Sequence, residues 1–284
     1  MKRKPFISII IPFYNSNLTL HNCLDSVFKS EYDNFEVIAI NDSSKDNSLS
    51  IVEKFPCKII NLDKRSGSAR ARNIGAKNSK GDILVFLDSD CTVDKNWLTN
   101  IVDNFKKYNI GCVAGQYKET LNENSISKFA FYELLFREKN FSKFVKTIPS
   151  CNFACKREIF NKVRGFSEKF RYSYTSEDLE FSYRLGKITR ILWEPSIHVS
   201  HHFRNKISGY LKQQFSSSRD DVFLFLRHPK LLVTETFEDK TNYIEIILTT
   251  LFLVLMPLFI FKVVNLYILL IPPLIILMAN INFI

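Results

Sequence analysis

Short apolar runs alternate with amphipathic segments through the first 119 residues of the chain. Runs such as 83–87 consist of Ile, Leu, Val and Phe, a composition typical of strands buried on both faces. Segments such as 19–30 space their apolar residues as an amphipathic helix does. Strands and helices that alternate with short turns predict an α/β fold with a mostly parallel central sheet, covered on both sides. The expected strands are 6–11, 35–40, 58–60 and 83–87, and the expected helices are 19–30, a short helix ending at Phe55, and one that begins at 69–76.

Residues 120–205 follow a less regular pattern. We expect an amphipathic helix near 125–144, a strand near 148–154 and a helix that begins at 175–178. These segments continue the same fold, so the predicted domain covers residues 1–205, with one half at 1–119 and the other at 120–205.

The end of the chain is strongly apolar. An 18-residue run from Ile244 to Phe261 would span roughly 27 Å as a helix, close to the thickness of a bilayer's hydrocarbon core. A second run extends from Val263 to Ile284. We predict a hairpin of two membrane helices over 243–284, preceded by an amphipathic interfacial segment over 206–242. A buried helical hairpin in a soluble protein is the alternative.

The formal net charge of +10 lies entirely on residues 1–242. Positive charge before a membrane helix predicts that the domain faces the cytoplasm. It also suits an anionic membrane surface or a phosphate-bearing substrate. The basic residues are not interleaved with aromatic ones and no nucleic-acid module is recognisable, so we expect no nucleic-acid partner. The six dispersed cysteines are expected to be free thiols.

Three aspartates follow the ends of predicted strands. Asp88 and Asp90 come directly after 83–87, and Asp42 follows 35–40. Ligands of open α/β sheets bind at the carboxyl ends of strands, and paired carboxylates are hard ligands for Mg²⁺ or Mn²⁺. Asp42 could accept hydrogen bonds from the base or ribose of a nucleotide. The alternative for each is simple turn or helix-cap chemistry.

Arginine and histidine side chains provide further candidate ligands. Arg72 lies among small residues at the start of a predicted helix, an arrangement that suits a diphosphate, although a solvated surface helix is the alternative. His198, His201 and His202 cluster near one another in sequence. One of these imidazoles could complete a metal site with Asp90, or the histidines could have no such role.

Glu177 and Asp178 stand in the expected first turn of a helix. The helix N-terminus would keep such a carboxylate ionised at pH 7, which suits a general base. The alternative is that both acids only complement the helix dipole.

Taken together, these segments resemble the inverting family 2 glycosyltransferases, whose catalytic domain has the GT-A fold. The resemblance covers most of residues 6–202, with Arg164 standing where the family has the first glycine of its acceptor-side segment. It is carried, in order, by Ile9–Asn15, Asn41–Asp46, Ala71–Gly75, Phe86–Asp90, Arg164–Glu168 and Thr175–Glu180.

The resemblance implies a role for each candidate residue. Asp178 would be the catalytic base. Residues 1–119 would form the nucleotide-binding half and 120–205 the acceptor half. The nucleotide sugar would contact Pro12, Tyr14, Asn15, Asp42, Arg72, Asp88 and Ser89, and the metal would be held by Asp88, Asp90 and His201.

The expected function is transfer of one sugar from a nucleotide-diphosphate donor to a glycan or lipid-linked acceptor of the cell envelope. One base and no candidate covalent nucleophile indicate a single displacement with inversion, assisted by Mg²⁺ or Mn²⁺. The segment 213–219 lacks the Gln-x-x-Arg-Trp motif of processive synthases. An inactive nucleotide-sugar-binding subunit is the alternative, whereas a sugar nucleotidyltransferase would need a Gly-rich loop after Ile11.

Overall fold

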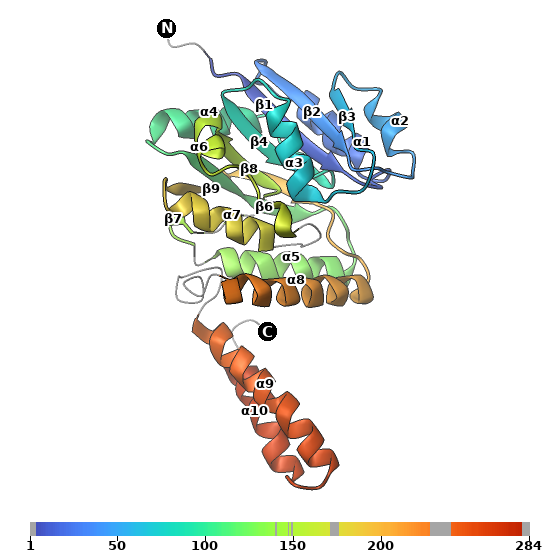
Figure 1. Cartoon of the computed structure of the whole chain (residues 1–284), viewed down its shortest axis with the longest axis vertical. Helices are drawn as coiled ribbons and strands as arrows, with labels where there is room; N and C mark the ends of the chain where they lie inside the picture. The colour runs from blue at the N-terminus through green and yellow to red at the C-terminus, as the bar shows by residue number, and fades with distance from the viewer. Residues whose placement is uncertain are drawn as a thin grey trace. The chain divides into compact units, whose positions relative to one another are not determined.

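The structure is a computed structural model that describes residues 4–139, 141–146, 148, 150–170, 176–227 and 240–279. The chain divides into two compact units, residues 1–231 and 232–284. The first unit contains a β-sheet with helices around it, and the second contains two helices (Figure 1).

The described residues of the first unit form a nine-stranded sheet in the order β3-β2-β1-β4-β8-β6-β9-β5, with β7 paired to β9. The first four strands in this order are parallel, and β8 then runs antiparallel to both β4 and β6. The sheet is therefore mixed, and the prediction of a mostly parallel sheet is corrected. The strands are β1 (Ile7–Phe13), β2 (Phe35–Asn41), β3 (Lys58–Asn61), β4 (Ile83–Leu87), β5 (Cys91–Val93), β6 (Cys112–Thr120), β7 (Phe144–Val145), β8 (Asn152–Lys156) and β9 (Ile191–His201).

Helices cover both faces of the sheet, as the sequence pattern predicts. Successive strand side chains point to opposite faces, so Ile9 and Ile10 enter different cores. Ile9 packs in the core of α1 (Leu20–Phe28), α2 (Ser48–Val52) and α4 (Trp97–Lys107). Ile10 packs in the core of α3 (Ser68–Lys77), α6 (Arg157–Lys162) and α7 (Ser176–Gly186).

An aromatic cluster fixes α7 on its face of the sheet. Phe181 of α7 stacks on Phe166 with ring centroids 4.1 Å apart, and it meets Phe153 of β8 edge to face. Aromatic pairs of this kind add about 1 kcal/mol each beyond the burial of their area. The cluster therefore holds the first turn of α7, with Glu177 and Asp178, in a defined place above the sheet.

Two further helices of the first unit lie on one side of the sheet (Figure 1). They are α5 (Ser125–Glu138) and α8 (Ile207–Arg227), which correspond to the predicted helix at 125–144 and to the start of the predicted interfacial segment. The hydroxyl of Tyr210 on α8 donates a hydrogen bond to Oε2 of Glu133 on α5, at 2.6 Å. This bond joins the two helices.

The second unit is a helical hairpin of α9 (Lys240–Ile260) and α10 (Leu266–Ala279), connected near Lys262 as the sequence predicts. None of the helices formed by the described residues is long and apolar enough to cross a membrane. The predicted pair of membrane-spanning helices is therefore not supported. The side chains of 243–247, 250 and 253 in the first predicted span, the side chains of 277–279 in the second, and residues 280–284 lie outside the described part of the chain.

Candidate active site

A cavity of about 1170 Å³ opens at the carboxyl ends of β1, β2 and β4. These three strands are parallel, so residues that follow them meet at one edge of the sheet. The base candidate on α7 and the histidine candidate on β9 reach the same cavity. It is lined by every residue to which the resemblance assigns a role, namely Pro12, Tyr14, Asn15, Asp42, Arg72, Asp88, Ser89, Asp90, Asp178 and His201.

Asp42 is buried and holds the loop that leads into α3. Its two carboxylate oxygens accept hydrogen bonds from the backbone N–H groups of Ser66 and Gly67, at 2.6 and 2.9 Å. Gly67 has φ 86°, a left-handed conformation that glycine adopts without strain. The adjacent turn is closed by the side chain of Asn41, which accepts from the backbone N–H of Ser44. Asp42 therefore reaches across to another loop instead of capping its own turn.

The loop after β1 presents an aromatic ring to the cavity. The guanidinium of Arg65 lies 4.1 Å from the centroid of the Tyr14 ring. Asn15 adopts φ 50°, and its side-chain oxygen accepts from the backbone N–H of Lys45 at 2.8 Å. This loop is thus fixed to the turn that follows β2, and the two together form one wall of the cavity.

Arg72 is buried and bridges two carboxylates. Its Nη2 donates to Asp88 at 2.7 Å and its Nη1 donates to Glu177 at 2.5 Å. Burial acts to lower the pKa of Arg72, but Asp88 and Glu177 outweigh it, so the pKa is raised. The alternative of a solvated surface arginine is therefore wrong. Both terminal nitrogens of Arg72, which the sequence suggests for a diphosphate, are bonded to carboxylates in this structure.

Asp178 presents a carboxyl group with one bonded and one unbonded oxygen. Its Oδ2 accepts from the backbone N–H of Ser150 at 2.9 Å, whereas its buried Oδ1 has no hydrogen-bond partner among the described residues. Burial raises the pKa of Asp178 to about 7, although nearby Arg72 opposes the shift. The expectation that the helix N-terminus keeps this group fully ionised at pH 7 is corrected, because burial outweighs the helix dipole.

Asp90 and His201 form the part of the site that could hold a metal. Oδ1 of Asp90 lies 3.4 Å from Nε2 of His201, and these atoms and the sulfur of Cys91 all lie within 4.8 Å of one another. The pairing of β5 with β9 places Cys91 opposite His201. Burial raises the pKa of the Cys91 thiol well above its usual value, so this sulfur is protonated and a poor ligand for a hard cation.

The side chains of the other two histidines of the cluster contact residues other than Asp90. Nε2 of His198 lies 2.6 Å from Oδ2 of Asp94, and Nδ1 of His202 lies 2.9 Å from Oδ1 of Asn122. Of the three, His201 is the one whose ring faces Asp90. Burial acts to lower the pKa of His201, but Asp90 outweighs it and the pKa is raised.

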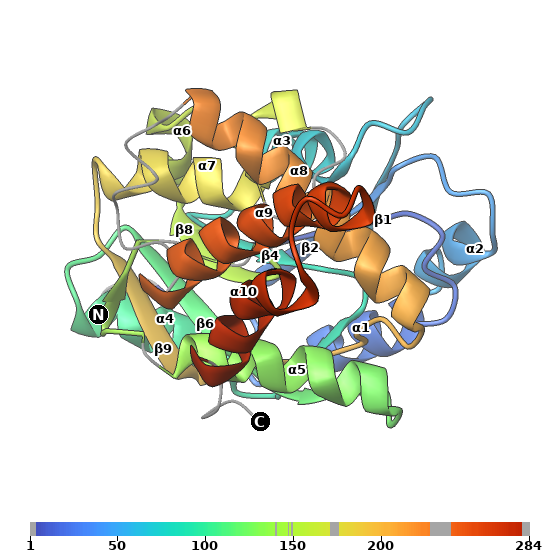
Figure 2. The same ribbon diagram turned by 90° about the horizontal axis from the view of Figure 1, so that it is seen from below.

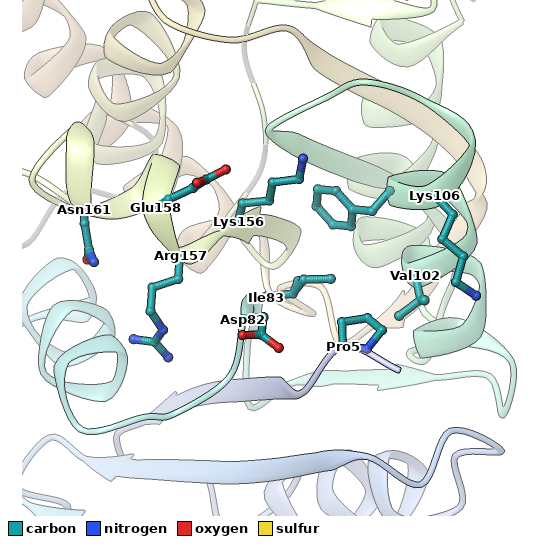
Figure 3. Close-up of a pocket in the computed structure, with 10 residues that line it drawn as sticks. Pro5, Asp82, Ile83, Val102, Lys106, Lys156, Arg157, Glu158 and Asn161 are labelled. Atoms are coloured by element: carbon teal, nitrogen blue, oxygen red, sulfur yellow. The ribbon is translucent and has the colours of Figure 1, made fainter. Parts of the chain in front are cut away.

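A second, smaller hollow of about 600 Å³ lies at the opposite end of β4 (Figure 3). Asp82, Lys156 and Arg157 face it. Arg157 is already bonded, since it donates to the backbone carbonyls of Gly81 and Ala76 at 2.6 and 3.0 Å. The candidate catalytic groups are all in the larger cavity.

Sequence reasoning missed several residues of the larger cavity. The contact between Tyr14 and Arg65, and the acceptance of the Ser150 N–H by Asp178, join segments far apart in the sequence. The helical pattern of α5 and α8 gives no sign that both helices line this cavity. Their contributions include Glu133, Leu134, Arg137, Tyr210, Lys212, Gln213 and Arg219.

The fold and the cavity define a class of protein, the α/β transferases with a GT-A-like fold and carboxylates at the strand ends. Residues 8–164 match the family described as Glycosyl transferase family 2. The chain therefore belongs to this family and is a glycosyltransferase.

Two curated relatives agree with this assignment. Glycosyltransferase GlyG of Streptococcus pneumoniae is 25% identical over 241 residues, which cover 77% of this chain and 78% of GlyG. An Escherichia coli protein, the UDP-Glc:alpha-D-GlcNAc-diphosphoundecaprenol beta-1,3-glucosyltransferase WfgD, is 31% identical over 161 residues, or 55% of this chain and 60% of WfgD. The chain thus spans less than two thirds of WfgD.

A solved structure shares the fold. The mannosyltransferase PcManGT of Pyrobaculum calidifontis, in complex with GDP-Man and Mn²⁺, matches with a TM-score of 0.65 and 19% identity. The match covers 81% of this chain and 65% of PcManGT. At this identity the likeness establishes the GT-A-like fold alone.

Proposed function

We propose that this glycosyltransferase moves one sugar from a nucleoside diphosphate sugar to an acceptor hydroxyl in a single displacement that inverts the anomeric carbon. One observation carries the proposal. Asp178, with its unbonded Oδ1, lines the same cavity as Asp88 and Asp90. The proposed base and the carboxylates at the end of β4 therefore face one cavity, of about 1170 Å³.

Asp178 is the proposed general base. Its carboxylate would accept the proton of the acceptor hydroxyl while that oxygen attacks the anomeric carbon and the bond to the nucleoside diphosphate breaks. A base works best when its pKa is near the working pH, and the pKa of Asp178 is raised to about 7. The backbone N–H of Ser150 holds Oδ2 and so orients the carboxyl group.

The residues present fit a divalent cation. Asp90 and His201 offer hard oxygen and nitrogen donors that already converge, and Asp88 lies at the same strand end. Mg²⁺ or Mn²⁺ bound there would neutralise negative charge on the departing diphosphate. PcManGT is described with GDP-Man and Mn²⁺, which supports the proposal of a metal-dependent nucleotide-sugar donor.

The proposed acceptor is a glycan or a lipid-linked sugar. The wall of the cavity formed by α5 and α8 carries Arg137, Lys212 and Arg219, which suit an acceptor that bears phosphate. WfgD is named for a diphosphoundecaprenol-linked acceptor, which supports this proposal. We also propose that the domain works at a membrane, on its cytoplasmic face.

The test combines donor binding with transfer. The purified chain is incubated with Mn²⁺ and a panel of nucleotide sugars, and thermal stabilisation identifies the donor. Transfer to lipid-linked and glycan acceptors is then measured for the wild type and for Asp178→Asn. We expect Asp178→Asn to lower transfer by about 10²–10⁴-fold and to leave donor binding unchanged, as loss of a general base does.

Asp103→Asn is the matched control, because this exposed carboxylate on α4 lies away from the cavity. Transfer that survives in Asp178→Asn would refute the base assignment. Donor binding with no transfer and no donor hydrolysis by the wild type would instead indicate an inactive binding subunit.

A further inference from the structure

Helix α8 exposes a stripe of large apolar side chains. Members of the stripe are four or seven residues apart, a spacing that places them on one side of a helix. Phe215, near the middle, is 74% exposed. The stripe consists of Ile207, Leu211, Phe215, Val222 and Leu226. Because α8 has 21 residues, the stripe runs along a helix of about 31 Å.

Helix α5 exposes a second, shorter stripe. Phe129, Tyr132 and Phe136 are spaced by three and four residues and are all exposed, Tyr132 by 61%. The ring of Phe129 meets that of Tyr210 on α8 edge to face, with centroids 5.8 Å apart. Figure 2 shows α5 and α8 in front of the strands when the molecule is seen from below. We call the two stripes together the docking face.

Basic side chains border the docking face. Lys212 directly follows Leu211 in the sequence, and Arg219 lies between Phe215 and Val222. Helix geometry places both basic residues just beside the α8 stripe. Lys128, next to Phe129, is exposed on α5. Arg219 is paired with Asp220 at 2.9 Å, so Lys212 and Lys128 provide the clearer positive charge. A helix with an apolar stripe and flanking lysines has the composition of helices that lie in the headgroup region of a bilayer.

We propose that the docking face binds the surface of a lipid bilayer that contains anionic headgroups. Its apolar side chains would enter the boundary between headgroups and acyl chains, and its lysines would contact the headgroups. Lys212 and Arg219, which border the docking face, also line the active-site cavity, so the docking face lies next to that cavity. The contact would bring a lipid-linked acceptor to the base, but the docking itself does not depend on the proposed chemistry.

The test uses the full chain with vesicles of phosphatidylcholine, with or without phosphatidylglycerol. Binding is measured by co-sedimentation, and hydrogen exchange is followed in peptides that cover 125–138 and 207–227. We expect binding to the anionic vesicles and slower exchange in both helices when those vesicles are present. The double variant Leu211→Gln/Phe215→Gln should bind at least about tenfold more weakly, because it removes two of the apolar side chains that would enter the bilayer.

Ile188→Gln is the matched control, because Ile188 is an exposed apolar residue outside both stripes and should be replaceable without loss of binding. Thermal unfolding checks that each variant folds, and hydrolysis of the donor reports on catalysis separately. Three outcomes would overturn the proposal. The first is vesicle binding by the double variant that equals that of the wild type, and the second is equal binding to charged and uncharged vesicles. The third is hydrogen exchange in α5 and α8 that is already slow without vesicles and does not change when vesicles are added. The last outcome would show that the second unit or another copy of the chain covers the docking face.

Discussion

The guanidinium of Arg72 and the carboxylate of Glu177 form a buried ion pair, with 2.5 Å between Nη1 and Oε1. Arg72 belongs to α3 and Glu177 to α7, 105 residues further along the chain. The two side chains are 4% and 3% exposed. Because Arg72 also bonds Asp88 at the end of β4, this pair connects the strand-end carboxylates to the helix that carries Asp178.

Replacement of Arg72 by methionine should strongly destabilise the protein. The variant keeps an unbranched side chain as far as the position of Nε but leaves Glu177 buried without its charged partner, which costs about 3–5 kcal/mol when one member of a buried pair is removed. Urea unfolding measures the effect. Arg70→Met on the same helix is the control, since Arg70 is 51% exposed and lies 3.9 Å from Glu168, and its loss should cost less than about 1 kcal/mol. Equal stability of Arg72→Met and the wild type would contradict this account.

The raised pKa of Asp178 predicts the pH dependence of transfer. The base must be deprotonated, so kcat/KM should rise with pH and level off above about 7, falling about tenfold for each unit below. The thermal stabilisation of the protein by the bound donor should not show this pH dependence. An acidic limb with the ordinary pKa of an aspartate, near 3.8, would exclude a buried Asp178 as the titrating group.

The same shift predicts how stability changes with pH. The folded pKa of Asp178 is above its unfolded value of 3.8, so its contribution to stability is fully present below 3.8 and is lost as pH rises through about 7. Asp178→Asn removes the titrating group. Its free energy of unfolding, relative to the wild type, should therefore increase between about pH 5 and about pH 8. Urea unfolding at the two pH values tests this, and a constant difference between the proteins would speak against it.

The strands nearest the site could be predicted because their signals are local. A buried run bounded by polar residues gives β4 at 83–87, the same bounds as in the structure, and β2 begins at Phe35 as predicted. An aspartate that directly follows a strand lies at the edge of the sheet, and this position does not depend on how the helices pack. For this reason the gathering of Asp42, Asp88 and Asp90 at one edge follows from the order of strands alone.

What sequence reasoning missed depends on contacts between distant segments. Strand β8 pairs with β4 and β6, and no local sequence pattern indicates which strands will pair. Because β8 runs antiparallel to both, the sheet is mixed. The ionisation of Asp178 was predicted from its helix position, yet burial beneath other segments decides its pKa. Likewise, nothing near Arg72 in the sequence indicates that Glu177 will occupy its guanidinium.

Removal of the His201 imidazole should weaken metal binding. Asp90 and His201 provide the converging hard donors, so Mn²⁺ affinity should fall by at least about tenfold in His201→Ala. Loss of a residue that only hydrogen-bonds to a metal ligand already lowers metal affinity by about this factor. Isothermal calorimetry with Mn²⁺ measures it. His198→Ala is the matched control, because His198 lies on the same strand as His201 but contacts Asp94 and not Asp90. Mn²⁺ affinity that is equal in the wild type and in His201→Ala would refute the assignment, and a chelator should abolish transfer by the wild type.

Gly115 on β6 has no room for a methyl group. A Cβ built there would lie 1.6 Å from the backbone carbonyl oxygen of Ile197 on β9, where the pairing of β6 and β9 shifts register. Because backbone must move to accept it, Gly115→Ala should destabilise the protein by about 3 kcal/mol or more. Gly186→Ala at the end of α7 is the matched control, since nothing lies within 4 Å of its Cβ, and alanine there should be neutral or stabilising by up to about 1 kcal/mol. Thermal and urea unfolding compare the two. If both variants unfold like the wild type, β9 does not pass Gly115 as closely as the structure shows.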